Sequence, residues 1–165
     1  MNGIEKEDIK NPLEIIESKQ RLKEMELSGQ YVFHGSPHLI SKFEPRQAYT
    51  ALDGESFADE EPAIFASSEI ELPIFRSIFH PSNYENVKGS FSTGMSHGRD
   101  MEPFFQVSKD AMEASRGEKG YVYVFEKNDF ELRDNIEWRS KKVIRPRAVF
   151  HSSFKDIGLP IRVDD

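Results

Sequence analysis

The chain has 165 residues, the usual size of one domain, and a formal charge of -7 from 29 acidic and 22 basic residues. This acidic excess disfavours nucleic acid as a partner. The absence of cysteine excludes disulfides, thiol nucleophiles and thiolate metal sites, and favours a reducing, cytoplasmic location. No apolar run approaches the roughly 18 residues of a membrane span. We expect one soluble domain over residues 1–165, with residues 1–10 as a flexible tail and no membrane partner.

The N-terminal region predicts one long helix. Asn11 and Pro12 match an N-cap followed by a first-turn proline, strong helix formers fill residues 13–28, and Gly29 supplies the stop. Apolar side chains recur on one broad face of this stretch, which favours packing against a sheet.

The next segment predicts a strand over residues 31–33, bounded by glycine and proline, with His34 at its end. Residues 37–62 lose all periodicity and are rich in Pro, Gly, Asp and Glu. A loop of that length in a small domain is usually functional, so we expect it to face a ligand.

The remainder of the chain predicts further strands and two helices. We expect strands over residues 62–66, 121–125, 136–143, 148–151 and 159–163. One helix should start after Ser67 or Ser68 and carry Pro73 in its first turn, and another should run over residues 109–116 from a Ser108 cap. Ser153 is expected to open a short turn.

Helices gathered early and strands gathered late, without regular βαβ alternation, indicate an α+β fold with a mixed or mostly antiparallel sheet. The 13 phenylalanines lie mainly in short apolar runs. Because aromatic residues in such runs favour strands, we expect a sheet with a phenylalanine-rich core.

Common catalytic signatures are missing: the sequence has no P-loop, GxGxxG, HExxH or GxSxG motif. His34 and His38 stand four apart, but Pro37 between them prevents the helix that would place both on one face. We therefore expect no metal site.

The stretch His34-Gly35-Ser36 offers a ring nitrogen and a hydroxyl beside a glycine that lets a ligand approach the backbone. An ordinary tight turn is the alternative interpretation. Two later segments bear on the choice, namely Ala63-Ile64-Phe65-Ala66 and Asn135-Ile136-Glu137-Trp138 with Pro146 behind it.

In this order the three segments resemble the motifs of the ADP-ribosyltransferase superfamily. The resemblance is to the histidine-tyrosine-glutamate branch, which includes the poly-ADP-ribose polymerases and small bacterial and phage relatives. It covers roughly residues 30–152 and implies an α+β fold with a split mixed or antiparallel sheet and an N-terminal helix packed on it.

The resemblance implies roles for individual residues. His34 would bind the adenosine ribose of NAD, the Gly35 backbone would hold the nicotinamide carboxamide, and Ser36 would lie nearby. Phe65 belongs to the second motif strand, and Phe75 falls where the family stacks an aromatic ring on nicotinamide.

Three further residues complete the expected site. Glu137, with His34 a candidate catalytic residue, would stabilise the positive charge that develops on the ribose when the glycosidic bond breaks. Arg46 and Tyr49 lie in the loop that often closes over NAD in the family, where the guanidinium of Arg46 could meet the pyrophosphate.

Plainer interpretations remain open for several of these residues. Phe75 could simply fill the core with Ile78 and Phe79, and Arg46 could be solvated. Glu137 could be an exposed strand residue paired with a nearby cation, for which the candidates are Lys141, Arg139 and Arg147. The chain also departs from the family through the inserted Ile136 and the phenylalanine in place of a tyrosine.

The resemblance thus implies an NAD-dependent ADP-ribosyltransferase that cleaves the nicotinamide-ribose bond and transfers ADP-ribose to an unknown acceptor such as a protein. NAD would be a substrate, and no metal would be needed. Two alternatives stay open: an RNA 2'-phosphotransferase-like enzyme, and a catalytically silent module of the same fold that binds NAD or a protein.

Overall fold

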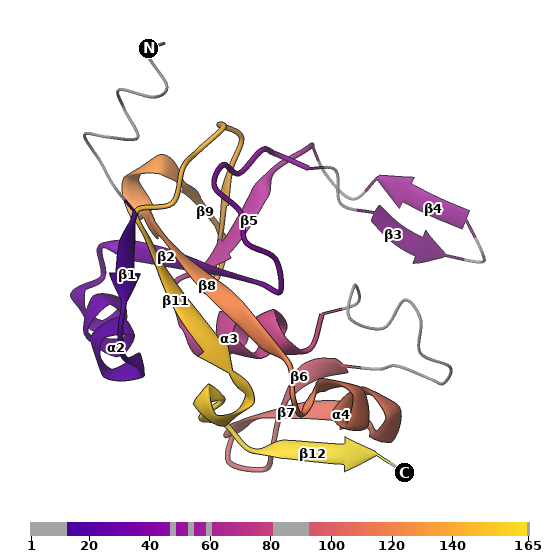
Figure 1. The fold of residues 1–165 in the computed structure, drawn as a ribbon. Helices are drawn as coiled ribbons and strands as arrows, with labels where there is room; N and C mark the ends of the chain where they lie inside the picture. Colours follow the sequence, from indigo (N-terminus) through magenta and orange to yellow (C-terminus); the bar gives the residue numbers. More distant parts are fainter. Residues whose placement is uncertain (1–12, 47–48, 53–54, 59–60, 81–92, 165) are drawn as a thin grey trace.

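The computed structural model describes residues 13–46, 49–52, 55–58, 61–80 and 93–164. These residues form two sheets, a separate hairpin and three α-helices (Figure 1). The helices are α2 (Lys19–Ser28), α3 (Glu71–Ile78) and α4 (Lys109–Ser115), and two 3-10 turns are η2 (Lys127–Asp129) and η3 (Phe154–Asp156). Within the described residues no helix is long and apolar enough to cross a bilayer.

The larger sheet has seven strands and mixed pairing. In spatial order they are β1 (Glu14–Ile16), β11 (Ala148–Ser153), β8 (Lys119–Glu126), β2 (Tyr31–Ser36), β5 (Ile64–Ser67), β10 (Glu137–Ser140) and β9 (Glu131–Asp134). Strand β1 is parallel to β11, whereas the other neighbours are antiparallel.

The second sheet has three strands, in the order β12 (Ile161–Asp164), β7 (Pro103–Ser108) and β6 (Thr93–His97). Strand β12 is parallel to β7 and β6 is antiparallel to it. The separate hairpin consists of β3 (Tyr49–Leu52) and β4 (Glu55–Ala58) and projects from the body of the molecule (Figure 1). The prediction of an α+β protein with mixed sheets is confirmed.

Strand β2 is paired very differently on its two sides. It pairs with β8 over its whole length, from Tyr31↔Glu126 to Ser36↔Tyr121. Toward β5, the register of the described strands holds one pair, Phe33↔Ser67. Beyond that pair the two strands diverge, so the larger sheet is split beside the end of β2.

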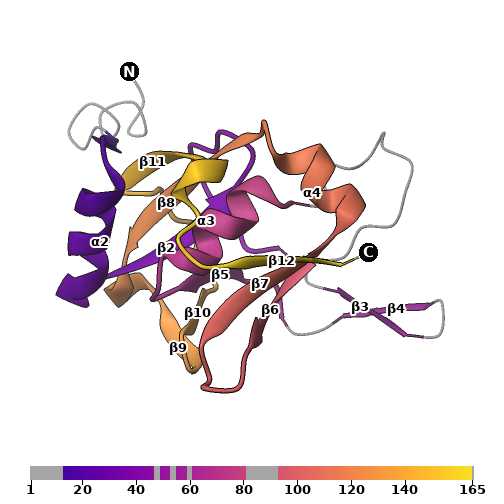
Figure 2. The same cartoon turned by 90° about the horizontal axis from the view of Figure 1, so that it is seen from below.

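Helix α3 lies between the two sheets (Figure 2). Ile74 packs into the core of the larger sheet, while Phe75 packs with Phe105 of β7. The helix approaches the larger sheet so closely that a Cβ on Gly35 would lie 1.8 Å from the Pro73 carbonyl oxygen, and one on Gly120 would lie 2.3 Å from that of Ser77. Two glycines therefore let helix backbone contact strand backbone.

The core is rich in phenylalanine, as the sequence predicts. Aromatic rings fill both faces of the larger sheet and the space between α3 and the smaller sheet. The buried phenylalanines are Phe33, Phe43, Phe75, Phe79, Phe104, Phe105, Phe125, Phe130 and Phe150.

The N-terminal prediction is right at one end only. Gly29 ends α2 in the left-handed conformation (φ 72°), as predicted. The helix begins later than predicted, however, because Ser18 is its N-cap and Glu14–Ile16 form β1 instead. Ladder hydrogen bonds to β11 and the burial of Ile16 outweigh helix propensity here. Asn11, Pro12 and the predicted tail over residues 1–10 lie outside the described residues.

Several other boundaries need correction. The segment 37–62 is not loop throughout, since it contains β3 and β4, and β1, β6, β7 and β9 were not predicted. Helix α3 starts after Ile70 without a side-chain cap, so neither Ser67 nor Ser68 caps it. The Ser108 cap of α4 is confirmed, and so is the short turn that Ser153 opens, which is η3 and begins with a capping box.

Candidate functional site

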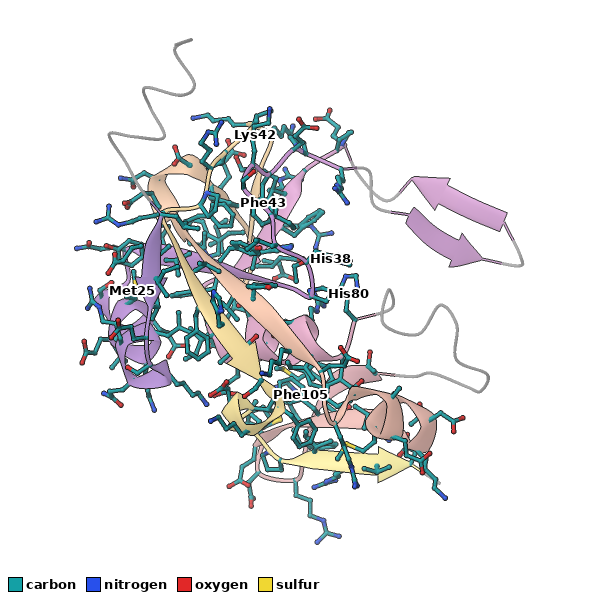
Figure 3. The ribbon with its side chains drawn as sticks, in the orientation of Figure 1. Met25, His38, Lys42, Phe43, His80 and Phe105 are labelled. Carbon is teal, nitrogen blue, oxygen red and sulfur yellow. The ribbon has the colours of Figure 1, made fainter. Side chains whose placement is uncertain are left out.

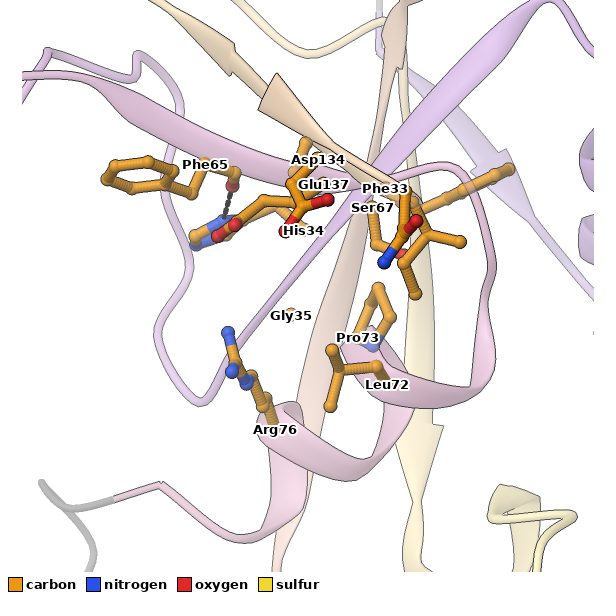
Figure 4. A pocket seen from close by; sticks show the side chains of 13 residues that line it. Phe33, His34, Gly35, Phe65, Ser67, Leu72, Pro73, Arg76, Asp134 and Glu137 are labelled. Carbon is orange, nitrogen blue, oxygen red and sulfur yellow. Dashed lines mark hydrogen bonds between the residues drawn. The ribbon is translucent and has the colours of Figure 1, made fainter. Parts of the chain in front are cut away.

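A cavity of about 280 Å³ lies where the larger sheet splits (Figure 4). Its walls come from β2, β5, α3 and the β9–β10 hairpin. The lining residues are Phe33, His34, Gly35, Phe65, Ala66, Ser67, Leu72, Pro73, Arg76, Asp134, Asn135, Ile136 and Glu137. Residues from all three predicted motifs therefore meet at one hollow, although they are far apart in the sequence.

His34 connects the two strands that diverge at the split. Its Nδ1 lies 2.6 Å from the carbonyl oxygen of Phe65 on β5 (Figure 4). Because a carbonyl can only accept a hydrogen bond, Nδ1 carries the proton. This side-chain bond continues the contact between β2 and β5 after their backbone pairing has stopped.

The surroundings of His34 keep its ring neutral. Burial is the main cause that lowers the pKa of His34 below its ordinary value, and the charges of Arg76, His80 and Arg46 lower it further, against the bond to Phe65. With Nδ1 protonated and the ring neutral, Nε2 has a free lone pair. His34 can therefore accept a hydrogen bond from a hydroxyl group of a ligand.

Gly35 lines the cavity, and its missing side chain makes room for the Pro73 carbonyl of α3. Ser36 is buried and does not line the cavity; its Oγ accepts a hydrogen bond from the His38 backbone at 3.1 Å. At the end of β2, Gly35 thus allows close packing of α3, and Ser36 stabilises the turn that follows. Of the two residues, Gly35 lines the cavity.

Glu137 lies at the first position of β10 and lines the same cavity as His34. In the pairing with β9 the register shifts by one residue between Glu137 and Trp138, and the extra residue is Arg133 of β9. Trp138 packs into the aromatic core, whereas the carboxylate of Glu137 faces the cavity (Figure 4). Glu137 and Trp138 therefore point to different sides of β10, whereas Ile136 lines the same cavity as Glu137.

The cation that pairs with Glu137 was not predicted. Arg133 Nη1 donates to Glu137 Oε2 at 2.6 Å. Of the three candidates from the sequence, Lys141 pairs with Glu61 and Arg147 with Glu126. The partner comes from β9, a strand that the sequence did not predict.

The turn before Glu137 accommodates the residue that departs from the family motif. Asn135 and Ile136 form the two-residue turn between β9 and β10, with Asn135 in the left-handed region (φ 45°), which asparagine tolerates. The Ile136 carbonyl accepts hydrogen bonds from the Ser68 backbone at 2.8 Å and from its hydroxyl at 3.4 Å. The extra residue is thus part of a turn anchored to the end of β5.

The two candidate aromatic residues take different places. Phe65 lines the cavity. Phe75 does not, because it is 2% exposed and stacked on Phe105 and Phe79 with ring centroids 4.0 and 4.7 Å away. On α3 the residues facing the cavity are Leu72, Pro73 and Arg76, so Phe75 lies on the other side of the helix.

Arg46 and Tyr49 are placed only in part. Arg46 is exposed and forms a backbone bridge with Ala63, and its charge acts on His34. It does not line the cavity. Tyr49 starts β3, and its side chain lies outside the described part of the structure.

Three polar residues of the site were missed by sequence reasoning: Arg76, Asp134 and Arg133. Arg76 stands three residues after Pro73, so a helical wheel anchored on Pro73 could have found it. Asp134 and Arg133 required knowledge of β9. The charge of Arg76 also lowers the pKa of His80. The ring centroid of His80 lies 6.3 Å from that of His38 (Figure 3).

The charges divide the cavity into two sides. Arg76 of α3 stands on one side, with His80 and Arg46 near enough to lower the pKa of His34. Asp134 and Glu137 of the β9–β10 hairpin stand on the other (Figure 4). A ligand with an anionic part and a part that carries or develops positive charge matches this arrangement.

Comparison of the chain with protein-family models, with curated proteins and with solved structures found no match. The function therefore has to be argued from the cavity and its residues.

Proposed function

We propose that this protein is an NAD-dependent ADP-ribosyltransferase, built on an ADP-ribosyltransferase-like split sheet, that cleaves the nicotinamide-ribose bond of NAD. The observation that carries the proposal is that His34 and Glu137 line one cavity. Membership of the family requires the first and third motifs to meet in this way. If the two short segments resembled the family by chance, nothing would bring them to the same cavity.

The size and chemistry of the cavity support the nicotinamide-ribose half of NAD as its occupant. Its volume of about 280 Å³ is just below the range of small-molecule pockets, which are typically about 300–1,000 Å³, and suits one half of NAD rather than the whole molecule. Phe65 offers an apolar ring for nicotinamide in place of Phe75, and the lone pair of His34 Nε2 can accept a ribose hydroxyl. Arg76 lines the cavity, and in this proposal it meets the phosphate, a role that the sequence suggested for Arg46.

The proposed reaction breaks the bond between ribose C1' and the nicotinamide nitrogen. The electron pair of that bond leaves with nicotinamide, which becomes neutral, and the ribose develops oxocarbenium-like positive charge. The Glu137 carboxylate stabilises this charge. An acceptor nucleophile, or water, then bonds to C1' and loses its proton to the carboxylate or to solvent.

The test measures nicotinamide release from NAD by the purified protein, alone and with cell extract as a source of acceptors. We expect Glu137→Gln to lower the rate by about 100-fold or more, because the charge facing the ribose is lost. Glu126→Gln is the matched control, since Glu126 also pairs with an arginine at the surface but does not line the cavity. Equal rates for wild type and Glu137→Gln would remove Glu137 from the proposal.

A 2'-phosphotransferase-like activity is a second candidate, favoured by Arg76 and Arg46 near His34. Such an enzyme needs cations at the phosphate that it removes. Incubation with NAD and a short RNA that carries an internal 2'-phosphate separates the two activities, since loss of the phosphate would assign the second. Calorimetric NAD binding without turnover of either substrate would assign the silent module.

A further inference from the structure

Arg133 contacts two walls of the cavity without lining it. From edge strand β9, its Nη1 donates to Glu137 Oε2 at 2.6 Å, and its Cζ lies 5.9 Å from the centre of the Phe65 ring. The Phe65 carbonyl in turn accepts the hydrogen bond of His34 at 2.6 Å. These contacts form a continuous chain from His34 on β2, through Phe65 and Arg133, to Glu137 on β10.

An arginine suits this place because its guanidinium can make both contacts at once. The plane of the group can lie over an aromatic face while the N–H groups at its edge donate to a carboxylate. A lysine ammonium keeps the charge but offers no plane to stack and no fixed direction for donation. The two contacts together therefore define an orientation for the Glu137 carboxylate.

The strand register places Arg133 beside Glu137. In β10, Glu137 and Trp138 pair one-for-one with Ser67 and Ala66 of β5, whereas the pairing with β9 shifts by one residue and the extra residue is Arg133. An extra residue in one strand re-aims the side chains beside it, and here Arg133 reaches Glu137. The Arg133 and Glu137 side chains are 37% and 38% exposed, so their ion pair by itself adds little to stability.

We propose that Arg133 is a positioning residue that holds the Glu137 carboxylate at the distance from His34 which the reaction requires. The inference rests on the proposed function. It assigns Arg133 no contact with NAD, and its effect passes through Glu137. Loss of Arg133 should therefore slow turnover and leave NAD binding unchanged.

A double-mutant cycle tests this role through the kcat and KM of nicotinamide release. We expect Arg133→Met to lower kcat roughly tenfold with KM for NAD unchanged, because a misdirected group loses reactive geometry and no binding contact. In the Glu137→Gln background the same substitution should change kcat less than about twofold. The kcat of Arg133→Lys should lie between those of wild type and Arg133→Met. If Arg133→Met does not fold, Arg133→Lys takes its place in the cycle.

Lys141→Met is the matched control. Lys141 also forms an exposed ion pair, with Glu61, next to β10, but neither residue lines the cavity. The Lys141→Met substitution should leave kcat unchanged. A wild-type kcat in Arg133→Met, or an equal loss in both backgrounds, would overturn the positioning role while leaving the proposed function intact. Absence of nicotinamide release by the wild type would overturn the proposed function and the role of Arg133 together.

Discussion

Strand β2 is paired along its whole length on one side and at one residue on the other. Toward β8 the strand is paired from Tyr31 to Ser36, and the flanking side chains are close-packed core. Toward β5 the described strands share the one pair Phe33↔Ser67, and a cavity opens beyond it. Full pairing on one side thus leaves no space beside the strand, whereas the interrupted pairing on the other side leaves a cavity.

The split leaves a strand edge that other parts of the chain must support. Helix α3 packs on Gly35 from one face, and the His34 ring reaches across to the Phe65 carbonyl. The segment after β2 is tied back by Tyr123 of β8, whose hydroxyl accepts from the Ile40 backbone at 2.5 Å and donates to the His38 carbonyl at 2.7 Å. Three supports thus replace the missing ladder, and each can be removed separately.

The largest effect should come from Gly35→Ala, which acts on the helix support. The new Cβ would fall 1.8 Å from the Pro73 carbonyl oxygen, so α3 must move away from β2. We expect a loss of more than about 3 kcal/mol in the free energy of unfolding in urea, or no folded protein. Gly94→Ala in β6 is the control: its Cβ would meet nothing within 4 Å, and stability should change by less than about 0.5 kcal/mol. Equal stability of the two variants would show that α3 does not need Gly35.

Tyr123→Phe should have an intermediate effect, because it removes the hydroxyl that ties the segment after β2. The Ile40 N–H and the His38 carbonyl lose their partner, at a cost of about 1–2 kcal/mol in unfolding free energy. Hydrogen exchange should speed up at the Ile40 amide and stay slow at the β2–β8 ladder. Unchanged exchange at Ile40 would mean that the segment is held by other contacts.

The smallest effect should be the pH dependence of stability that His34 contributes. Burial lowers the pKa of His34 in the folded protein, so the unfolded chain binds more protons below about pH 6.5. Stability should therefore fall as the pH drops below this value. His80, whose pKa is lowered by its burial and by His38 and Arg76, adds to the same slope.

The measurement is urea unfolding at pH 7.5 and pH 5.5. His34→Gln should be less stable than wild type at pH 7.5, because the bond to Phe65 is altered, but should lose less stability on acidification. An identical pH slope in wild type and His34→Gln would show that His34 does not titrate in this range.

Local patterns predicted the parts of the site that depend on chain neighbours. A short apolar run between glycines predicted a strand over residues 31–33 that ends at His34; β2 is there, but it continues to Ser36, so His34 lies within it. Glu137 and Trp138 lie on different sides of β10, as alternation in a strand predicts. The caps at Gly29 and Ser108 were found for the same reason, since a cap is made by residues within one turn.

Long-range contacts explain what was missed. Phe75 was expected to face the ligand from its spacing after the second motif. In the structure its ring stacks on Phe105, which belongs to a strand that was not predicted. The next residue of α3, Arg76, faces the cavity instead. Glu14–Ile16 have helix-forming neighbours, but the edge of β11 pairs with them as a strand.

The sequence by itself determined the α+β class, the strand that carries His34 and the aromatic composition of the core, because propensity and periodicity act over a few residues. Tertiary structure alone decided that β2 and β5 separate, that His34 and Glu137 share a cavity, and that Arg133 is the partner of Glu137. These features depend on how strands distant in sequence pair, and pairing partners are chosen by the packing of the whole sheet.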